Sequence, residues 1–185
     1  IRDRFYSISN CQDGLSRVTL GNFLIKRVVF EIQEELPNIK NFGTLSPIPG
    51  FRDWYVNLDE KLVKNILGNI PLENISFLKS SSLKIGDTRI ISNKNAIYKL
   101  VAHYLMNEKN SKQLPINDVC RFHLGNGAII DDIVINANIS EVGFKRSFGV
   151  MVNYLYELKN IEKNHEEYIN KKTTIISNKV KKLIQ

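Results

Sequence analysis

Two short segments of this 185-residue chain each place one potentially reactive side chain beside residues that restrict the backbone. Ser46 lies within Leu45–Phe51 (LSPIPGF), where Pro47 and Pro49 fix their own φ angles and favour extended geometry in the residues before them. We therefore expect Ser46 on a stiff, non-helical turn. His123 comes just before an Asn-Gly turn signal (FHLGNGA). A serine and a histidine held in this way can act together in proton transfer.

Structural roles for both residues remain open at this point. No GxSxG elbow surrounds Ser46, which argues against an α/β-hydrolase nucleophile, and a turn serine often only caps a nearby backbone N–H. A single histidine is more often structural than catalytic. We predict a strand over Val119–Leu124, which would turn His123 away from the apolar side. The other histidines, His103 and His165, have no metal-ligand spacing with nearby residues.

The segment Gln12–Asn22 is a candidate anion site. It joins a predicted strand to the start of a long predicted helix, and Gly14 and Gly21 permit tight turns. The first turn of a helix leaves backbone N–H groups unpaired, which suits a pyrophosphate. The segment matches neither a Walker A nor a GxGxxG pattern, so an ordinary strand-to-helix turn is the alternative.

Polar side chains also interrupt the apolar run Ser147–Tyr156. Asn153, Tyr154 and Tyr156 are the polar groups of this run. Such residues either satisfy buried backbone groups or line a pocket. The run itself does not decide between helix and strand over Val150–Leu158.

Hydrophobic periodicity predicts the elements that must position these residues. Strands are predicted at Arg4–Ser9, Phe42–Leu45, Val119–Leu124 and Ala128–Ile135, with a turn at Asn10–Gly14; helices are predicted at Leu20–Leu36 (ended by Pro37), within 57–81, at Asn93–Asn107 and after Asn160. This pattern indicates one domain of the α/β or α+β class.

Composition restricts the class of protein further. The chain is 43% hydrophobic and 24% charged, it has no apolar run near the ~20 residues of a membrane span, and its start is unlike a secretory signal. The net charge of +7 fits an anionic ligand, but the basic residues are not interleaved with aromatic ones, which argues against nucleic-acid binding. Cys11 and Cys120 form neither a disulfide framework nor a CxxC zinc pair, and we expect reduced thiols.

Taken together, these segments resemble the malonyl-CoA decarboxylase family. The matches follow one another along nearly the whole chain: FYSIS at 5–9, Gln12, Gly14-Leu15, GNFLIKRVV at 21–29, LSPIPGF at 45–51, FHL at 122–124, NGA at 126–128, Ser140, Gly143, Ser147, Gly149, MVNY at 151–154 and IEKNHE at 161–166.

The resemblance implies a mixed sheet flanked by helices, similar to the Gcn5-related acetyltransferase fold, and decarboxylation of malonyl-CoA to acetyl-CoA and CO₂. It implies Ser46 and His123 as catalytic residues, with His123 as proton donor and Ser46 as proton acceptor or relay contacting the malonyl group, and the order of proton transfers stays open. Residues implied to bind the malonyl-CoA substrate are Ser16, Arg17, Val18, Thr19, Leu20, Gly21, Asn22, Ser46, His123 and Tyr156. It implies no metal and no separate cofactor, since coenzyme A is part of the substrate and the thioester accepts the electron pair.

The resemblance also sets expectations for the protein as a whole. Residues 1–185 would be the C-terminal part of the catalytic domain, without the family's helical N-terminal domain and the first catalytic strands. The full-length protein would be a homo-oligomer that is cytoplasmic or in the mitochondrial matrix, not secreted, with an acyl-CoA as its small-molecule partner. A CoA-dependent acyltransferase and an inactive acyl-CoA-binding module are the alternatives.

Overall fold

The structure is a computed structural model that describes residues 20–39 and 41–185, with the backbone alone for 20–26. The chain divides into two units, 1–40 and 41–185, and each is described by itself. The first contains helix α1 (Leu20–Glu35), which ends one residue before the predicted end at Leu36 and carries an exposed Arg27–Glu31 ion pair of 2.6 Å. The strand predicted at Arg4–Ser9 and the turn at Asn10–Gly14 lie outside the described residues.

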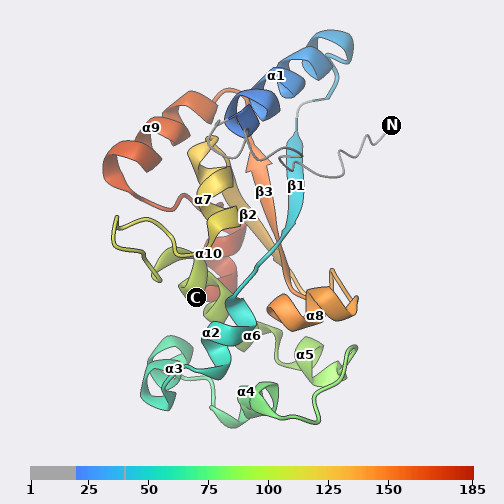
Figure 1. The fold of residues 1–185 in the computed structure, drawn as a ribbon, viewed down its shortest axis with the longest axis vertical. Coiled ribbons are helices and arrows are strands. Elements are labelled where there is room, and N and C mark those ends of the chain that lie inside the picture. The colour runs from blue at the N-terminus through green and yellow to red at the C-terminus, as the bar shows by residue number, and fades with distance from the viewer. Residues whose placement is uncertain (1–19, 40) are drawn as a thin grey trace. The chain divides into compact units, whose positions relative to one another are not determined.

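A three-stranded antiparallel sheet forms the centre of the second unit (Figure 1). Strand β3 (Met151–Tyr156) lies between β1 (Phe42–Pro47) and β2 (Ile129–Val134). The register of β2 shifts between Ile130 and Asp132, and an isolated parallel bridge joins Ile130 to Ile176. The strands that the structure describes thus pair antiparallel, where the resemblance implied a mixed sheet.

Helices cover this sheet and extend beyond one end of it (Figure 1). Helices α7 (Asp118–Gly125) and α10 (Asn178–Ile184) pack against β2, α9 (Ile161–Lys171) packs on α7, and α6 (Lys94–Met106) packs on α10. The shorter helices are α2 (Phe51–Val56), α3 (Glu60–Leu67), α4 (Glu73–Ser76), the 3₁₀ helix η2 (Phe77–Lys79), α5 (Thr88–Ser92) and α8 (Glu141–Ser147). The unit is therefore a mixed α and β structure with a small antiparallel sheet.

Most predicted elements of this unit are confirmed, and one is wrong. The strands near 42 and 128, the helix near 93 and the helical tail are present, and the ambiguous run after 150 is strand β3. The strand predicted at Val119–Leu124 is helix α7. The Asn117 side chain caps this helix by accepting a hydrogen bond of 2.8 Å from the Cys120 backbone N–H, which favours a helical start.

Aromatic side chains join the short helices to the rest of the core. Phe51 is fully buried and packs edge-on against Phe148 at a centroid distance of 6.1 Å, and Phe148 also contacts Tyr55. Phe148 ends α8 with a φ of 55°, an uncommon value for a bulky residue, and the packing of its buried ring offsets that strain. This core fixes the end of β1 relative to α2 and α8.

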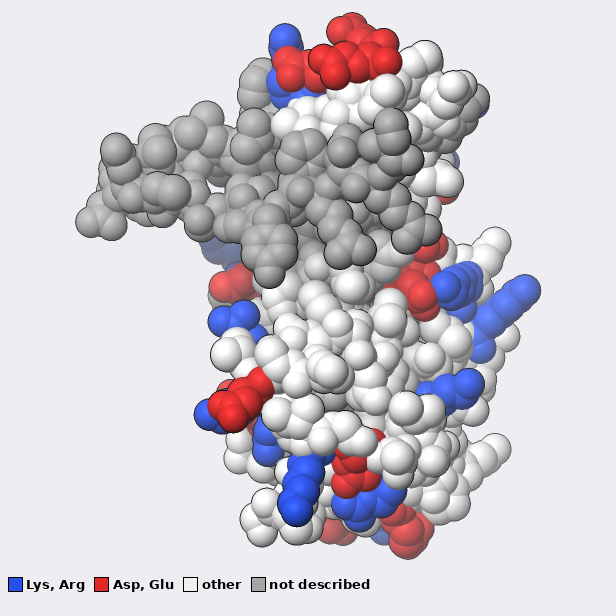
Figure 2. Space-filling view, turned by 90° about the vertical axis from the view of Figure 1, so that its right-hand side faces the viewer, with Lys and Arg blue, Asp and Glu red and all other residues white. Residues whose placement is uncertain are grey.

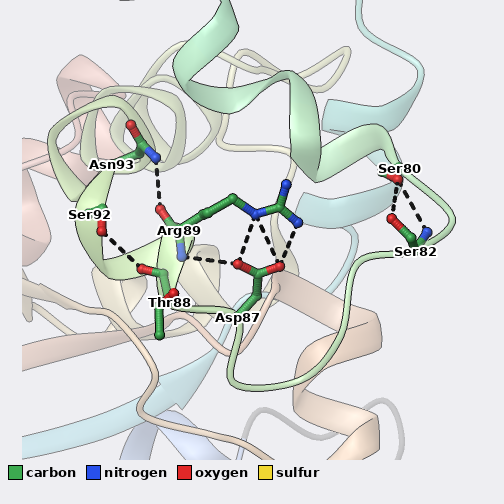
Figure 3. Close-up of polar contacts among 7 residues, drawn as sticks. All are labelled: Ser80, Ser82, Asp87, Thr88, Arg89, Ser92 and Asn93. Carbon is green, nitrogen blue, oxygen red and sulfur yellow. Dashed lines mark hydrogen bonds and ion pairs between the residues drawn. The ribbon is translucent and has the colours of Figure 1, made fainter.

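An exposed polar cluster caps helix α5 (Figure 3). The Asp87 carboxylate accepts from the Arg89 backbone N–H at 3.0 Å and pairs with the Arg89 guanidinium at 2.7 Å. Hydrogen bonding from Arg89 holds the pKa of Asp87 below its ordinary value. We call the residues drawn in Figure 3 the Asp87 cluster: Ser80, Ser82, Asp87, Thr88, Arg89, Ser92 and Asn93. Each hydrogen bond of this cluster joins residues that are two to four positions apart in the sequence.

The described surface shows two further properties. None of the helices among residues 20–39 and 41–185 is long and apolar enough to cross a membrane.

On the face drawn in Figure 2, Lys and Arg side chains are mixed with Asp and Glu side chains and do not gather into one basic patch. On that face, the charge pattern gives no support to a nucleic-acid interface.

Candidate active site

The sheet brings several of the candidate residues onto one face. In the antiparallel pairing of β1 with β3, Ser46 lies opposite Val152, and Thr44 lies opposite Tyr154. Residues directly opposite one another share a face, and residues two apart along a strand share it too. Thr44, Ser46, Tyr154 and, two residues on, Tyr156 therefore face the same side of the sheet. Ser46 belongs to strand β1 and is buried, which corrects its predicted place on a turn.

The loop after Ser46 is held by hydrogen bonds to a single carbonyl. The Pro49 carbonyl oxygen accepts from the Asn117 side-chain amide at 2.9 Å and from the Tyr104 hydroxyl at 3.1 Å. Gly50 follows with a φ of 81°, and a Cβ there would approach the Tyr104 hydroxyl to 2.8 Å. Asn117 also caps α7, so one side chain ties the Ser46 loop to the helix that carries His123.

His123 lies in the last turn of α7 and is buried, with only 6% of its surface exposed. This corrects the prediction that it faces away from the apolar side. Cys120, His123 and Leu124 recur at helical spacing and form the buried stripe of α7. The Asn-Gly sequence after His123 ends a helix here and does not join two strands. A glycine with positive φ serves a helix end as well as a hairpin.

The C-terminal end of α7 is locked against α9. Gly127 adopts a φ of 80°, and a Cβ on it would lie 2.2 Å from the Ile161 carbonyl oxygen. The Asn164 side-chain amide donates to the Gly127 carbonyl at 3.1 Å, and His165 Nδ1 is 2.6 Å from the Gly125 carbonyl oxygen. These contacts fix the turn that follows His123 and so the height of its ring above the sheet.

Four side chains form a continuous hydrogen-bonded chain across this site. We call them the His123 cluster: Thr44, Ser46, His123 and Tyr156. His123 Nε2 is 3.0 Å from Ser46 Oγ, and His123 Nδ1 is 2.7 Å from the Tyr156 hydroxyl. The Ser46 hydroxyl donates to Thr44 Oγ1 at 3.2 Å. The Tyr154 ring stacks on the imidazole at a centroid distance of 4.3 Å and an interplanar angle of 19°. The ring of His123 is therefore held at both nitrogens and on one face.

Burial keeps this cluster uncharged. Desolvation lowers the pKa of His123 to about 4, and it raises the pKa of Tyr156 above its ordinary value. Burial likewise raises the pKa of Cys120, next to Tyr154, to about 12. Near pH 7 the imidazole is thus neutral and carries one N–H donor and one acceptor nitrogen. A neutral imidazole beside a hydroxyl can pass a proton and can donate to an oxygen that gains negative charge.

The outcome for the other predicted site residues differs. Tyr156 contacts His123 directly, and its substrate contact, which the resemblance implied, stays a prediction. Ser16, Arg17, Val18 and Thr19 lie outside the described residues. Leu20, Gly21 and Asn22 form the first turn of α1, where only the backbone is described, so their substrate contacts stay a prediction.

Two open hollows in the described surface do not coincide with this site. One, of about 430 Å³, lies between α6, β2 and α10 and includes Tyr98, Asp132 and Lys179; the other, of about 270 Å³, includes His103. Neither is lined by Ser46 or His123. We base the site on the hydrogen-bonded cluster, since reactive groups in mutual contact point to chemistry more directly than the size of a hollow. In the described part of the chain, no group of His, Cys, Asp and Glu residues has the geometry of a metal site.

Sequence reasoning missed two residues of this arrangement. Thr44 could have been found from strand alternation, since it lies two residues before Ser46 and shares its face once the strand is extended through Ser46. Asn117 could have been found as an N-cap, because Asn-Asp followed by a helical stripe is a helix-start signal.

The fold and the site together define an α/β protein with an uncharged Ser–His–Tyr site between a sheet and a helix. Residues 3–185 match the family described as malonyl-CoA decarboxylase C-terminal domain. The chain belongs to the malonyl-CoA decarboxylase family, as its sequence segments predicted.

Curated relatives and solved structures agree with this assignment. The chain is 36% identical to "Malonyl-CoA decarboxylase, mitochondrial" of the goose Anser anser anser over 91% of its length, and 35% identical to the Mus musculus protein of that name over 97%. The crystal structure of malonyl-CoA decarboxylase from Cupriavidus metallidurans is 37% identical to this chain and covers 97% of it with a TM-score of 0.79. The crystal structure of malonyl-CoA decarboxylase from Agrobacterium vitis is 36% identical and covers 98% with a TM-score of 0.81.

The match covers only part of each relative. The chain spans 37% and 40% of the goose and mouse proteins and 47% and 44% of the two crystallised chains.

Proposed function

We propose that this chain carries the catalytic Ser–His pair of a malonyl-CoA decarboxylase, which converts malonyl-CoA to acetyl-CoA and CO₂. The single observation that carries the proposal is the 3.0 Å contact between Ser46 Oγ and His123 Nε2 in a chain of this family. The pair is buried and neutral, which suits a reaction whose charge develops on the substrate thioester.

The proposed chemistry uses the thioester to hold the electron pair. The bond between the malonyl C2 and its carboxylate breaks, CO₂ leaves, and the electron pair passes to C2 and the thioester oxygen as an enolate. Ser46 then gives its hydroxyl hydrogen to C2, forming the new C–H bond of acetyl-CoA, and takes the Nε2 hydrogen of His123 in its place. Nδ1 takes the hydrogen of the Tyr156 hydroxyl, which keeps the imidazole neutral, and one proton from solvent per turnover restores Tyr156. Tyr156 holds the imidazole at Nδ1 and so sets its orientation.

Coenzyme A is proposed to bind at Ser16–Asn22, where the N-terminus of α1 offers unpaired N–H groups to a pyrophosphate. The thioester of the substrate serves as the electron sink in this scheme, so no separate cofactor is invoked. We further propose that residues 1–185 form the C-terminal part of the catalytic domain, that this domain is similar to the Gcn5-related acetyltransferase fold, and that the full-length protein is a homo-oligomer. We propose the cytoplasm or the mitochondrial matrix as its location; the goose and mouse relatives are named mitochondrial.

CO₂ release from malonyl-CoA by the native full-length protein tests the proposal. We expect Ser46→Ala and His123→Ala each to lower kcat by about 10²-fold or more while CoA binding persists, because each removes one member of the proton-transfer pair. Ser82→Ala, an exposed serine of the Asp87 cluster, is the matched control and should leave kcat unchanged.

Other results would contradict the assignment. Binding of malonyl-CoA without CO₂ release, even with the pair intact, would indicate an inactive acyl-CoA-binding module. Transfer of the acyl group to an added acceptor amine, without release of CO₂, would indicate a CoA-dependent acyltransferase.

A further inference from the structure

The hydrogen bonds of the His123 cluster run in one direction, and that direction gives Thr44 a role. The Ser46 hydroxyl has a single hydrogen, which it donates to Thr44 Oγ1 at 3.2 Å. At the 3.0 Å contact with His123, Ser46 must therefore accept, so the imidazole hydrogen lies on Nε2. The neutral ring then accepts at Nδ1, and the Tyr156 hydroxyl donates to it.

The opposite direction leaves a buried donor without an acceptor. If Nδ1 carried the hydrogen, Tyr156 would accept from it and would need another acceptor for its own hydrogen. Tyr156 is 1% exposed, and among residues 20–39 and 41–185 its hydroxyl has His123 Nδ1 as its hydrogen-bond partner. An unsatisfied buried hydroxyl is unfavourable, which selects the direction from Tyr156 to Thr44. Burial keeps the pKa of Tyr156 high, so this hydroxyl remains a donor.

Thr44 ends the chain with a free donor. Its Oγ1 accepts from Ser46, and in the described part of the chain its own hydroxyl hydrogen has no acceptor. Thr44 is half-buried, whereas Ser46, His123 and Tyr156 are buried, so the chain leads from the core toward the surface. A hydroxyl that accepts one hydrogen bond is polarised toward donating the next.

We propose that Thr44 is a further substrate-contacting residue, whose hydroxyl is the outer donor of a one-way chain from Tyr156 through His123 and Ser46. The inference rests on the proposed decarboxylase function for its ligand: the thioester oxygen of malonyl-CoA, which gains negative charge as CO₂ leaves. A donor already aligned by three linked groups stabilises that oxygen without reorganisation. Thr44 thereby contributes more to the transition state than to substrate binding.

Two variants of Thr44 test the role of its hydroxyl separately from the shape of its side chain. Thr44→Val removes the hydroxyl and keeps the volume, and Thr44→Ser keeps the hydroxyl. In CO₂ release by the full-length protein, we expect Thr44→Val to lower kcat about 10-fold to 100-fold with KM nearly unchanged, and Thr44→Ser to stay within about 3-fold. Equal kcat values for Thr44→Val and the native protein would overturn the proposal, as would a loss confined to KM.

Nitrogen-15 NMR of the His123 ring tests the direction of the chain without turnover. The native protein should show the tautomer with hydrogen on Nε2, and Thr44→Val should increase the Nδ1–H population because Ser46 then loses its acceptor. An Nδ1–H tautomer in the native protein would overturn the proposal even if Thr44→Val is inactive or unfolded. Absence of CO₂ release with an Nε2–H tautomer would instead refute the decarboxylase function and leave the hydrogen-bond direction standing.

Discussion

The His123 cluster joins segments that are distant in sequence, whereas the Asp87 cluster joins near neighbours. Ser46 and Tyr156 lie 77 and 33 residues from His123, and the bonds of the Asp87 cluster span two to four residues. The first cluster is buried and uncharged, and the second is exposed and contains an ion pair. An exposed local cluster can form and break with its own loop, but the buried one exists only when the whole unit is folded.

Two glycines with the same positive φ angle allow the largest test of this difference. Gly127, beside the His123 cluster, and Gly86, beside the Asp87 cluster, both have a φ of 80°. A Cβ at Gly127 would lie 2.2 Å from the Ile161 carbonyl oxygen, but at Gly86 it would meet nothing within 4 Å. We expect Gly127→Ala to destabilise the protein by about 3 kcal/mol or more, and Gly86→Ala by about 1 kcal/mol, from backbone strain alone.

Chemical denaturation of both variants measures this difference directly. Gly127→Ala should also reduce CO₂ release, since it displaces α7 from α9, while Gly86→Ala should not. Equal losses of stability would mean that the end of α7 can move away from α9 freely, and would remove the basis for treating it as fixed.

The pH dependence of stability gives the next largest effect. His123 has a folded pKa of about 4, below its ordinary 6.5, so between these values the unfolded chain binds a proton that the folded chain does not. Stability should therefore fall as the pH is lowered from 6.5 to 4, by about 3 kcal/mol for this residue.

The Asp87 cluster supplies the contrast, because its effect belongs to a lower pH window. The pKa of Asp87 is lowered from 3.8, so the stability it adds is present above pH 3.8 and is lost as the pH falls through its folded pKa.

Urea titrations at pH 7, 5.5 and 4.5 test the effect of His123. The free energy of unfolding should fall with pH in the native protein and should not fall in His123→Gln. The same loss in both proteins would assign it to other groups.

The link at Asn117 gives the smallest of these effects. Asn117→Ala removes both the α7 cap and the bond to the Pro49 carbonyl, and should cost about 2 kcal/mol. Asn117→Ser can still cap but cannot reach Pro49, so it should cost about 1 kcal/mol and isolate the link to the Ser46 loop.

Asp59→Ser, at the exposed cap of α3, is the matched control and should leave both stability and kcat nearly unchanged. A kcat for Asn117→Ser equal to that of the native protein would show that the loop keeps Ser46 in place without Asn117.

The sequence predicted elements with long, regular periodicity better than those set by single contacts. Helix α6 and strand β2 were predicted close to their observed bounds because their apolar patterns are unambiguous. Helix α7 was predicted as a strand, because an Asn-Gly pair suggests a hairpin and eight residues are too few to show a clear helical period. The contacts of α9 with Gly127 stabilise a helix end there, and that information lies more than 30 residues downstream.

The candidate site was predicted in part. Ser46 and His123 were selected from restricted backbones, but local sequence gave no measure of their distance. Tyr156 was noted as a polar group of an apolar run, and only the resemblance gave it a role in the site. Thr44 was missed since the predicted strand stopped one residue before Ser46. The polarity of the hydrogen-bond chain depends on which partners each buried hydroxyl has, which only three-dimensional packing determines.

The strand order of the sheet also has a consequence for biosynthesis. Strand β1 pairs only with β3 in the described sheet, and its partner for Ser46 is Val152, more than 100 residues later in the chain. During translation, β1 leaves the ribosome with its pairing edge unsatisfied until more than 100 further residues have been made. Such long-range pairing makes folding slow relative to helical proteins. The nascent chain therefore exposes an aggregation-prone edge over this interval, and the site can form only after β3 has been made.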